Sequence, residues 1–298
     1  MKKYDFYSKN LNKSVIALGF FDAVHVGHKK VLTTCVELAK KLNAEPVAFT
    51  FSDTLSSFGK GDKLLSTYTE RLEKFSNLGI ESVLKAPSDE SFFAIESIDF
   101  LRKLKEDFNV VGIVCGEDFT FGAGGIGNVE YLKEFCQKYN VVLKVVEVLK
   151  IDDKKIGARD IKGLVIEGKI KEANLLLGYN YLLKGIVKKG RGDGKSYGVP
   201  TINVDYPREK VIPKPGVYIT DTRVDGVTYR GITNVGEHPT FCDNTQNIET
   251  YLLDVDIDLY EKIVEIEFLE YLRGIKRFSS PQELKAQISL DAEKAREL

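Results

Sequence analysis

The chain has 298 residues, of which 43% are hydrophobic, 10% aromatic and 29% charged. This length favours two domains, and this composition excludes a disordered chain, a collagen-like chain and a coiled coil. The 43 Lys and Arg residues balance the 44 Asp and Glu residues to a formal net charge of −1. A chain with balanced charge has no overall positive electrostatic field that would attract nucleic acid or a membrane surface. Any phosphate binding must therefore depend on local groups.

The four cysteines, Cys35, Cys115, Cys136 and Cys242, lie far apart and form no Cys-x-x-Cys pair. This spacing predicts neither a zinc site nor a disulfide framework, and a reducing cytoplasm is the natural setting. The first residues are not followed by an apolar signal core, and no run approaches the roughly 18 apolar residues that span a bilayer. We therefore expect a cytoplasmic protein that is neither secreted nor inserted in a membrane.

Short β-branched runs alternate with helical patterns in the first half of the chain, which is typical of a parallel sheet covered by helices. Strands are predicted at residues 14–19, 46–51, 81–85, 110–115 and 141–148, and helices at 27–42, 68–78, 97–105 and 129–138. Such a doubly wound α/β domain binds its ligands at the carboxyl ends of the strands. The loops after Gly19, Phe51 and Cys115 are therefore the expected place of a site.

A helix over residues 161–177, with Gly178 as its stop, is expected to connect this domain to a second one. After this helix, the apolar residues follow a strand-like pattern with Gly and Pro between the runs, which predicts a small antiparallel β-barrel. Its strands are expected at residues 181–188, 201–204, 216–222, 228–235, 248–255 and 263–272.

A last helix follows Ser279-Ser280-Pro281, because a Ser N-cap and Pro at the first helical position are both favoured. Its apolar residues Leu284, Ile288 and Ala295 should lie on the barrel. The predicted fold class is thus α/β followed by β, with domains at residues 1–180 and 181–298.

His25 and His28, two of the chain's three histidines, lie between the first strand and the first helix. Both imidazoles can face one point, where the helix N-terminus favours an anion. A nucleotide phosphate is the expected ligand, and Gly19, Phe21 and Gly27 are expected to contribute to its binding. The alternative interpretation is that the two histidines only cap a surface helix.

A glycine-rich segment, residues 116–127, contains a literal GxGxxG from Gly122 to Gly127. A dinucleotide fingerprint would need its first glycine directly at the strand end, but residues 116–121 intervene. A flexible lid over a nucleotide or flavin fits better, with Phe119 and Phe121 offering apolar surface to a ring. Alternatively, both rings simply pack in the core.

The segment 190–196 resembles a P-loop but is one residue short, and it leads into a strand entry with Pro200 instead of a helix. It remains a flexible basic loop. Thr201 and Asn203 alternate along the next strand and point the same way, so their oxygens can bind one hard cation that carries nucleotide phosphates. The alternative is a hairpin with polar cross-strand pairs.

Glu249 begins a later strand, where a carboxylate can act as general base towards a substrate hydroxyl. On its own, a carboxylate in this position is more often an exposed charge in a strand ladder. Asp254, Asp256 and Asp258 lack the glycine and closing Glu of a calcium loop and are interpreted as a solvated hairpin end.

In their order along the chain, these motifs resemble the bacterial bifunctional riboflavin kinase/FMN adenylyltransferase family, also called FAD synthetase, over essentially the whole sequence. The segment 25–28 is similar to the nucleotidyltransferase HxGH motif, and residues 116–122 to the family's GxDFxFG loop. Residues 198–203 are similar to the kinase GxPTxN motif.

The resemblance implies ATP-dependent phosphorylation of riboflavin to FMN in the barrel, and adenylation of FMN to FAD with release of pyrophosphate in the first domain. Thr201 and Asn203 would hold Mg²⁺ with the ATP phosphates, and Glu249 would accept the proton of the riboflavin 5′-hydroxyl. The loop over the nucleotide would be formed by Gly190, Gly192, Gly194 and Lys195. Flavin contacts are implied for Asp118, Phe119, Phe121, Arg273 and Phe278.

The first domain departs from the family pattern. Residues 156–162 read Ile-Gly-Ala-Arg-Asp-Ile-Lys where the family has Ile-Ser-Ser-Thr-x-Ile-Arg, so hydroxyl donors to the triphosphate are missing. Lys162 keeps a positive charge without the bidentate fork of Arg, and Arg159 would substitute in part. Ala23 stands where the family has Gly, and Phe20 where it has Asn. These changes predict slow adenylation or none.

Two functions from different classes follow. One is the bifunctional enzyme, with riboflavin, FMN and ATP as its small-molecule partners. The other is a riboflavin kinase whose first domain is an inactive or regulatory flavin- or nucleotide-binding module. Neither nucleic acid nor membrane is an expected partner, and the chain is expected to be a monomer or a weak homo-oligomer.

Overall fold

The computed structural model describes residues 1–9, 12–51, 63–148, 150–151, 154–189, 199–237, 246–255 and 257–298. The chain divides into two compact units, Met1–Ala158 and Arg159–Leu298. The sequence pattern predicts the boundary after residue 180 instead. The two divisions differ in the segment 159–180, which carries two helices.

The first unit is built on a six-stranded sheet with the order β1-β4-β3-β2-β5-β6, and all of its strand pairs are parallel. This confirms the predicted parallel α/β sheet. The strand β1 was not predicted. The strands are β1 (Lys2–Asp5), β2 (Ser14–Leu18), β3 (Glu45–Phe51), β4 (Ser82–Ala86), β5 (Val110–Gly116) and β6 (Val142–Val146).

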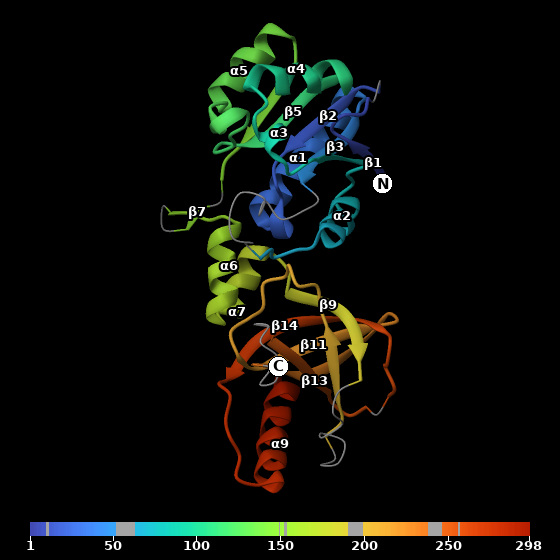
Figure 1. The fold of residues 1–298 in the computed structure, drawn as a ribbon, viewed down its shortest axis with the longest axis vertical. Helices are drawn as coiled ribbons and strands as arrows, with labels where there is room; N and C mark the ends of the chain where they lie inside the picture. The colour runs from blue at the N-terminus through green and yellow to red at the C-terminus, as the bar shows by residue number, and fades with distance from the viewer. Residues whose placement is uncertain are drawn as a thin grey trace. The chain divides into compact units, whose positions relative to one another are not determined.

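Helices cover both faces of this sheet (Figure 1). Along β2, Val15 and Ala17 belong to one buried cluster, whereas Ile16 and Leu18 belong to the cluster on the opposite face. This period of two buries the strand on both sides, which explains its continuous apolar sequence. The helices are α1 (Val26–Leu42), α2 (Tyr68–Asn77), α3 (Glu90–Phe93), α4 (Ser97–Asp107) and α5 (Val129–Lys138).

The order of the strands reverses at β2. The chain passes from β2 to β3 and β4 on one side of the sheet, and then to β5 and β6 on the other side. The carboxyl ends of β2 and β5 therefore form the switch point at which open α/β sheets leave a crevice.

The segment between the sheet and the barrel differs from the prediction. The expected strand 141–148 ends at Val146, and a small hairpin follows, formed by β7 (Lys150–Ile151) and β8 (Lys154–Lys155). The single helix expected over 161–177 is wrong: there are two helices, α6 (Ala158–Glu167) and α7 (Ile170–Leu177). Gly168 separates them with φ +78°, a backbone angle that favours glycine.

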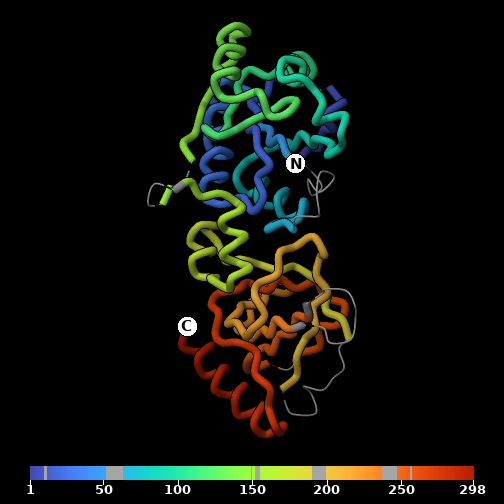
Figure 2. The backbone as a smooth tube through the Cα atoms, turned by 60° about the vertical axis from the view of Figure 1, so that its left-hand side comes forward, coloured from blue at the N-terminus to red at the C-terminus, as the bar shows by residue number. Residues whose placement is uncertain are grey.

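The second unit contains a closed barrel with the strand order β10-β13-β12-β11-β14-β9, which confirms the predicted antiparallel barrel. Its backbone can be followed in Figure 2. Thr220, Thr233 and Thr250 are fully buried and are joined by hydrogen bonds of 2.8 Å between their hydroxyls. The strands are β9 (Tyr181–Lys188), β10 (Thr201–Asp205), β11 (Gly216–Val224), β12 (Val227–Glu237), β13 (Gln246–Leu252) and β14 (Ile263–Arg273).

The last helix, α9 (Pro281–Glu297), begins as predicted: the side chain of Ser280 accepts a hydrogen bond from the N–H of Glu283. Its C-terminal end lies at the barrel in Figure 1, and Ala292 and Ala295 are the apolar residues that it buries there. The predicted stripe is therefore correct at Ala295, whereas Leu284 and Ile288 are only half-buried. In the part of the chain that the structure describes, no helix is long and apolar enough to cross a membrane.

Candidate active sites

A cavity of about 580 Å³ lies at the carboxyl ends of the central strands of the first unit. It is lined by Gly19 after β2, Phe51 at the end of β3, Gly116 at the end of β5 and Val146 at the end of β6. These include the strand ends that the sequence analysis selected. Residues 52–62, which follow β3, lie outside the described part of the chain.

Phenylalanine rings form much of the cavity wall. Phe119 and Phe121 stack with their centroids 5.8 Å apart and an interplanar angle of 13°. Phe51 and Phe93 stack in the same way, at 5.8 Å and 14°. Phe121 belongs to the buried core and also lines the cavity. Flat apolar surfaces of this kind suit a planar aromatic ligand.

His25 is the N-cap of α1. Its Nδ1 accepts hydrogen bonds from the N–H groups of Gly27 (3.1 Å) and His28 (3.4 Å). Because Nδ1 accepts, the proton of the neutral ring resides on Nε2, which is left to donate to a ligand. The His28 ring stacks on it with a centroid distance of 3.7 Å, and both rings line the cavity. The capping role and the ligand-facing role therefore coexist.

Both imidazoles are neutral near neutral pH. Burial lowers the pKa of His25 to about 4, against the opposing effect of the Asp22 and Asp118 carboxylates. Burial also lowers the pKa of His28 well below its usual value, and the nearby His25 ring adds to this. Within the described residues, Nδ1 of His28 has no hydrogen-bond partner. The two neutral rings can therefore form hydrogen bonds with a phosphate, but they do not neutralise its negative charge.

The turn before the histidines has unusual backbone geometry. In the 3₁₀ turn η1 (Asp22–Val24), Ala23 has φ +69° and Val24 has φ +50°, which costs non-glycine residues about 1–2 kcal/mol each. The buried carboxylate of Asp22 holds the turn by accepting the N–H groups of Leu65 (3.0 Å) and Ser66 (2.9 Å). This anchor fixes the entry into α1 and hence the position of His25.

Phe21 supports the histidines from the core. Its ring is 1% exposed and packs edge-on against His28 (5.3 Å) and Phe75 (5.7 Å). A Cβ atom at Gly19 would lie 2.8 Å from this ring, so only glycine fits there. Both residues line the cavity.

The GxGxxG segment forms a closed turn. Phe121 and Gly127 exchange backbone hydrogen bonds of 3.0 and 2.9 Å, and the residues between them include a single 3₁₀ turn, η3 (Ala123–Gly125). A dinucleotide fingerprint would open an α-helix at this point. The segment therefore does not fit that fingerprint, although Gly122 and Gly125 line the cavity.

A second polar cluster lies on the outside of the barrel. Asn203 on β10 is the register partner of Glu249 on β13, and Glu249 is in turn the partner of Asn234 on β12. Directly opposite residues share a face, with Cβ atoms about 5 Å apart. Thr250 points into the barrel, so its neighbour Glu249 points outward, together with Asn203 and Thr201.

The carboxylate of Glu249 is held in place on its own strand. The side-chain amide of Asn247 donates to its Oε1 at 2.6 Å. This cluster offers a hydroxyl and amide oxygens, which are suitable ligands for a hard cation. It also offers one carboxylate, which can accept a proton from a substrate. Gly190, Gly192, Gly194 and Lys195, predicted to cover this ligand, lie outside the described residues.

Two family models match this chain, one for FAD synthetase over residues 7–159 and one for riboflavin kinase over residues 177–298. The chain belongs to the bifunctional riboflavin kinase/FMN adenylyltransferase family. It is 32% identical to the Bacillus subtilis (strain 168) protein of that name over 290 residues, which cover 95% of this chain and 92% of the relative. The identity to the Listeria monocytogenes protein is 31% over 293 residues, which cover 96% and 92%.

The crystal structure of a macrolide-efflux protein from Streptococcus pneumoniae has the same fold. Its TM-score is 0.92 at 25% identity, and the match covers 100% of both chains. The family is one of transferases with kinase and nucleotidyltransferase activity, and both of its domains are present in this chain.

The family's hydroxyl-rich phosphate segment is replaced in this family member. Gly157 and Ala158 line the cavity and offer no side-chain donor. The predicted phosphate ligands Arg159 and Lys162 follow on α6; Arg159 is exposed and Lys162 is half-buried, and both belong to the second unit. The predicted flavin contact Asp118 does line the cavity.

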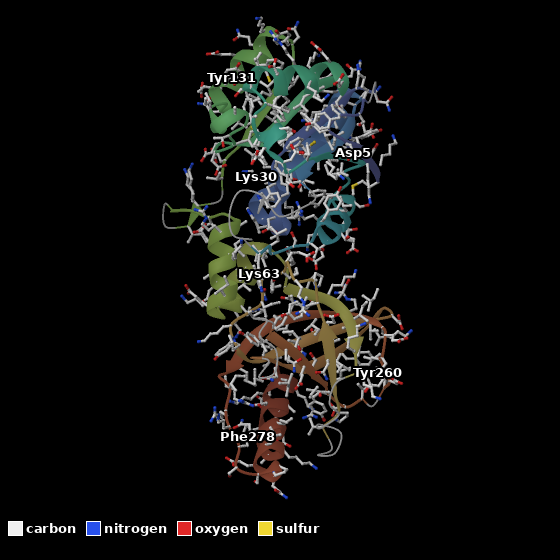
Figure 3. All side chains as sticks on the ribbon, in the orientation of Figure 1. Asp5, Lys30, Lys63, Tyr131, Tyr260 and Phe278 are labelled. Carbon is white, nitrogen blue, oxygen red and sulfur yellow. The ribbon has the colours of Figure 1, made fainter. Side chains whose placement is uncertain are left out.

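Arg273 has a clear structural role in this member of the family. Its Nε donates to Oδ2 of Asp291 at 2.9 Å and its Nη2 to the same atom at 2.6 Å, and Asp291 is only 2% exposed. The guanidinium lies 6.0 Å from the ring of Phe278, which Figure 3 labels beside α9. Arg273 thus ties the end of β14 to α9 and supports Phe278, the other predicted flavin contact.

Several residues at both sites are not predicted from the sequence. Phe92 and Phe93 line the cavity from α3, far from the selected loops, and nothing in their local pattern indicates this position. Asn247 could have been found, because it lies two positions before Glu249 on one strand and therefore on the same face.

Proposed function

We propose that this chain phosphorylates riboflavin to FMN at the barrel cluster and adenylates FMN to FAD at the cavity of the first unit. The observation that carries the proposal is that each matched domain holds its own cluster of suitable groups. These are His25 and His28 beside a phenylalanine-lined cavity, and Thr201, Asn203 and Glu249 on one barrel face.

In the kinase reaction, Glu249 accepts the proton of the riboflavin 5′-hydroxyl, whose oxygen forms a bond to the γ-phosphorus of ATP. The bond from the γ-phosphorus to the bridging oxygen breaks, and its electron pair leaves with ADP. Asn247 orients this carboxylate through its 2.6 Å hydrogen bond to Oε1, which leaves Oε2 for the substrate.

Mg²⁺ fits the donors of this cluster. Thr201 and Asn203 provide neutral oxygen atoms on one face of β10, and Mg²⁺ prefers oxygen ligands. Among the described residues, no three His, Cys, Asp or Glu side chains gather into a protein-only metal cage. This favours a site completed by ATP phosphates and water. The bound cation neutralises phosphate charge.

In the adenylation, the flavin ring lies against the phenylalanine wall and the FMN phosphate faces the histidines. An oxygen of that phosphate forms a bond to the α-phosphorus of ATP, while the bond from the α-phosphorus to the bridging oxygen breaks. The electron pair of that bond leaves with pyrophosphate. The neutral His25 donates from Nε2 to the charge that develops on the phosphate.

The alternative, a first domain that binds flavin or nucleotide without turnover, is motivated by the altered segment 156–162. A chromatographic time course of the full-length protein with riboflavin, ATP and Mg²⁺ separates the two functions. We expect FMN to appear first and FAD to follow it. FMN alone would favour the regulatory alternative, and the absence of both products would overturn the proposal.

A further inference from the structure

The cavity of the first unit is short of positive charge for the substrates that it is proposed to hold. Its described lining includes the carboxyl groups of Asp118 and Glu147 and the neutral rings of His25 and His28, but no Lys or Arg. FMN and ATP both bring phosphate anions to this place. Cations that neutralise them must therefore come from segments adjoining the lining.

The β7–β8 hairpin is such a segment. Glu147 and Val148 line the cavity just before it, and residues 156–158 line the cavity just after it. Lys155 directly precedes the lining residue Ile156, and Lys150 is two positions beyond Val148. The base of the hairpin thus adjoins the cavity wall on both of its strands.

Two lysines face the same way at this base. Lys150 and Lys155 are direct partners in the antiparallel register, so their side chains share one face with Cβ atoms about 5 Å apart. The Nζ of Lys150 is 4.0 Å from Oε1 of Glu117, which stands between the lining residues Gly116 and Asp118. This contact turns the shared face towards the loop after β5, at the edge of the cavity.

Neither lysine is neutralised by a close ion pair among the described residues. The Lys150 contact is at the limit of such a pair, and Lys155 is exposed without an acidic partner in the described part of the chain. Like charges directly opposite each other in a ladder are unfavourable, and an anion bound between them removes that repulsion. Asp152 and Asp153 lie outside the described residues.

We infer that Lys150 and Lys155 bind the β- and γ-phosphates of ATP during adenylation and then hold the leaving pyrophosphate. This inference rests on the adenylation proposed above. The two ammonium groups take over the task of hydroxyl donors that are missing at Gly157 and Ala158. Because pyrophosphate departs with the electron pair of the broken bond, its charge increases in the transition state, where fixed cations stabilise it most.

The first test measures FAD formation from FMN and ATP by the full-length protein. In the double variant Lys150→Ala/Lys155→Ala we expect the KM for ATP to rise about tenfold or more, with the KM for FMN unchanged. Lys155→Arg should retain most of the wild-type behaviour, because it keeps the charge. A KM for ATP within twofold of wild type in the double variant would overturn the inference.

Two controls separate this effect from general damage. Lys40→Ala removes a lysine from the opposite, C-terminal end of α1 and should leave the KM for ATP unchanged. FMN formation from riboflavin, which the second unit performs, should be equal in all variants. If the KM for ATP also rises in the Lys40→Ala variant, the effect is due to overall charge and the inference is contradicted.

A binding measurement keeps the test independent of adenylation. Inorganic tripolyphosphate is titrated calorimetrically into the full-length wild type and the double variant, which have identical barrels. We expect weaker binding in the double variant. If wild type forms no FAD but this difference is present, the lysine assignment stands and the proposed adenylation fails. Equal binding in both proteins would refute the assignment, even if wild type forms FAD.

Discussion

The hydroxyl of Ser66 bridges the side chain of Asp22 and the backbone of Ala23 in the strained turn before α1. It donates to the carboxylate of Asp22 at 2.9 Å and accepts from the N–H of Ala23 at 2.7 Å. Asp22 is 3% exposed, so its charge depends on these contacts for stabilisation. The positive φ angles of Ala23 and Val24, and with them the placement of His25, are maintained by this pair.

The first prediction concerns this pair. Asp22→Asn should lower the free energy of unfolding of the first unit by about 1.5–3 kcal/mol, because charge-assisted hydrogen bonds are weakened. FAD formation should fall at the same time, whereas FMN formation should be kept. Calorimetric unfolding and product chromatography measure both effects. Ser91→Ala removes the exposed Ser91–Asp89 hydrogen bond of 2.5 Å and is the matched control that should change neither.

The second prediction is a pH dependence of stability caused by His25. Its pKa is about 4 in the folded chain and 6.5 unperturbed, so between these values the unfolded chain binds a proton that the folded chain excludes. The stability contribution is complete above pH 6.5 and is lost as the pH falls towards 4. From pH 7 to pH 5 this amounts to about 2 kcal/mol.

His25→Asn tests this dependence, because Asn is a good N-cap but does not titrate. The variant should therefore lose less stability than wild type between pH 7 and pH 5, as followed by urea unfolding at each pH. It should also lose FAD formation, since the Nε2 donor is gone. Parallel stability profiles of variant and wild type would contradict the proposed burial of a neutral His25.

The third prediction concerns the cation at the barrel. Asn203→Ala should reduce FMN formation by at least about tenfold at limiting Mg²⁺, with partial recovery at high Mg²⁺, because one of two protein oxygen ligands is removed. Chelation of Mg²⁺ should stop the wild-type reaction. The control is Asn180→Ala, which removes an amide that donates a hydrogen bond of 3.1 Å to the carboxylate of Glu267 on the same barrel. An equal loss in both variants would argue against a metal role for Asn203.

The fourth prediction concerns the buried ion pair of the second unit. Arg273→Ala leaves the carboxylate of Asp291 buried without its cationic partner and should destabilise the barrel by about 3–5 kcal/mol. The double change Arg273→Met/Asp291→Leu should cost much less, since no charge is left buried. Thermal unfolding measures both. If the two variants are equally unstable, packing of Arg273 and not the uncompensated charge is responsible.

Local sequence patterns predicted most of the fold because they follow directly from burial. The strand β2 is apolar from Val15 to Leu18 since both faces are covered, and Ser280 with Pro281 is a local helix start. By contrast, β1 is a short edge strand of mostly charged residues and lacks such a pattern. Gly168 is visible in the sequence, but the helix break at this residue depends on its positive φ, which the sequence alone does not reveal.

The same distinction applies to the sites. His25 and His28 were predictable because their spacing and the helix start are local features. The partner of Arg273 was not, because Asp291 comes from another element and meets it only in the packed structure. The Asp22–Ser66 contact joins residues 44 positions apart and was likewise out of reach. Side chains that hold a site in place are mostly of this long-range kind.

Complementation between two variants tests the central claim of two separate active sites on one chain. Riboflavin, ATP and Mg²⁺ are supplied to His28→Ala, to Glu249→Gln and to their mixture, and FMN and FAD are followed by chromatography. We expect FMN alone from the first variant, neither product from the second, and FAD from the mixture, because FMN made by one protein is adenylated by the other. Loss of FMN formation in His28→Ala, or a mixture that yields no FAD, would contradict the account.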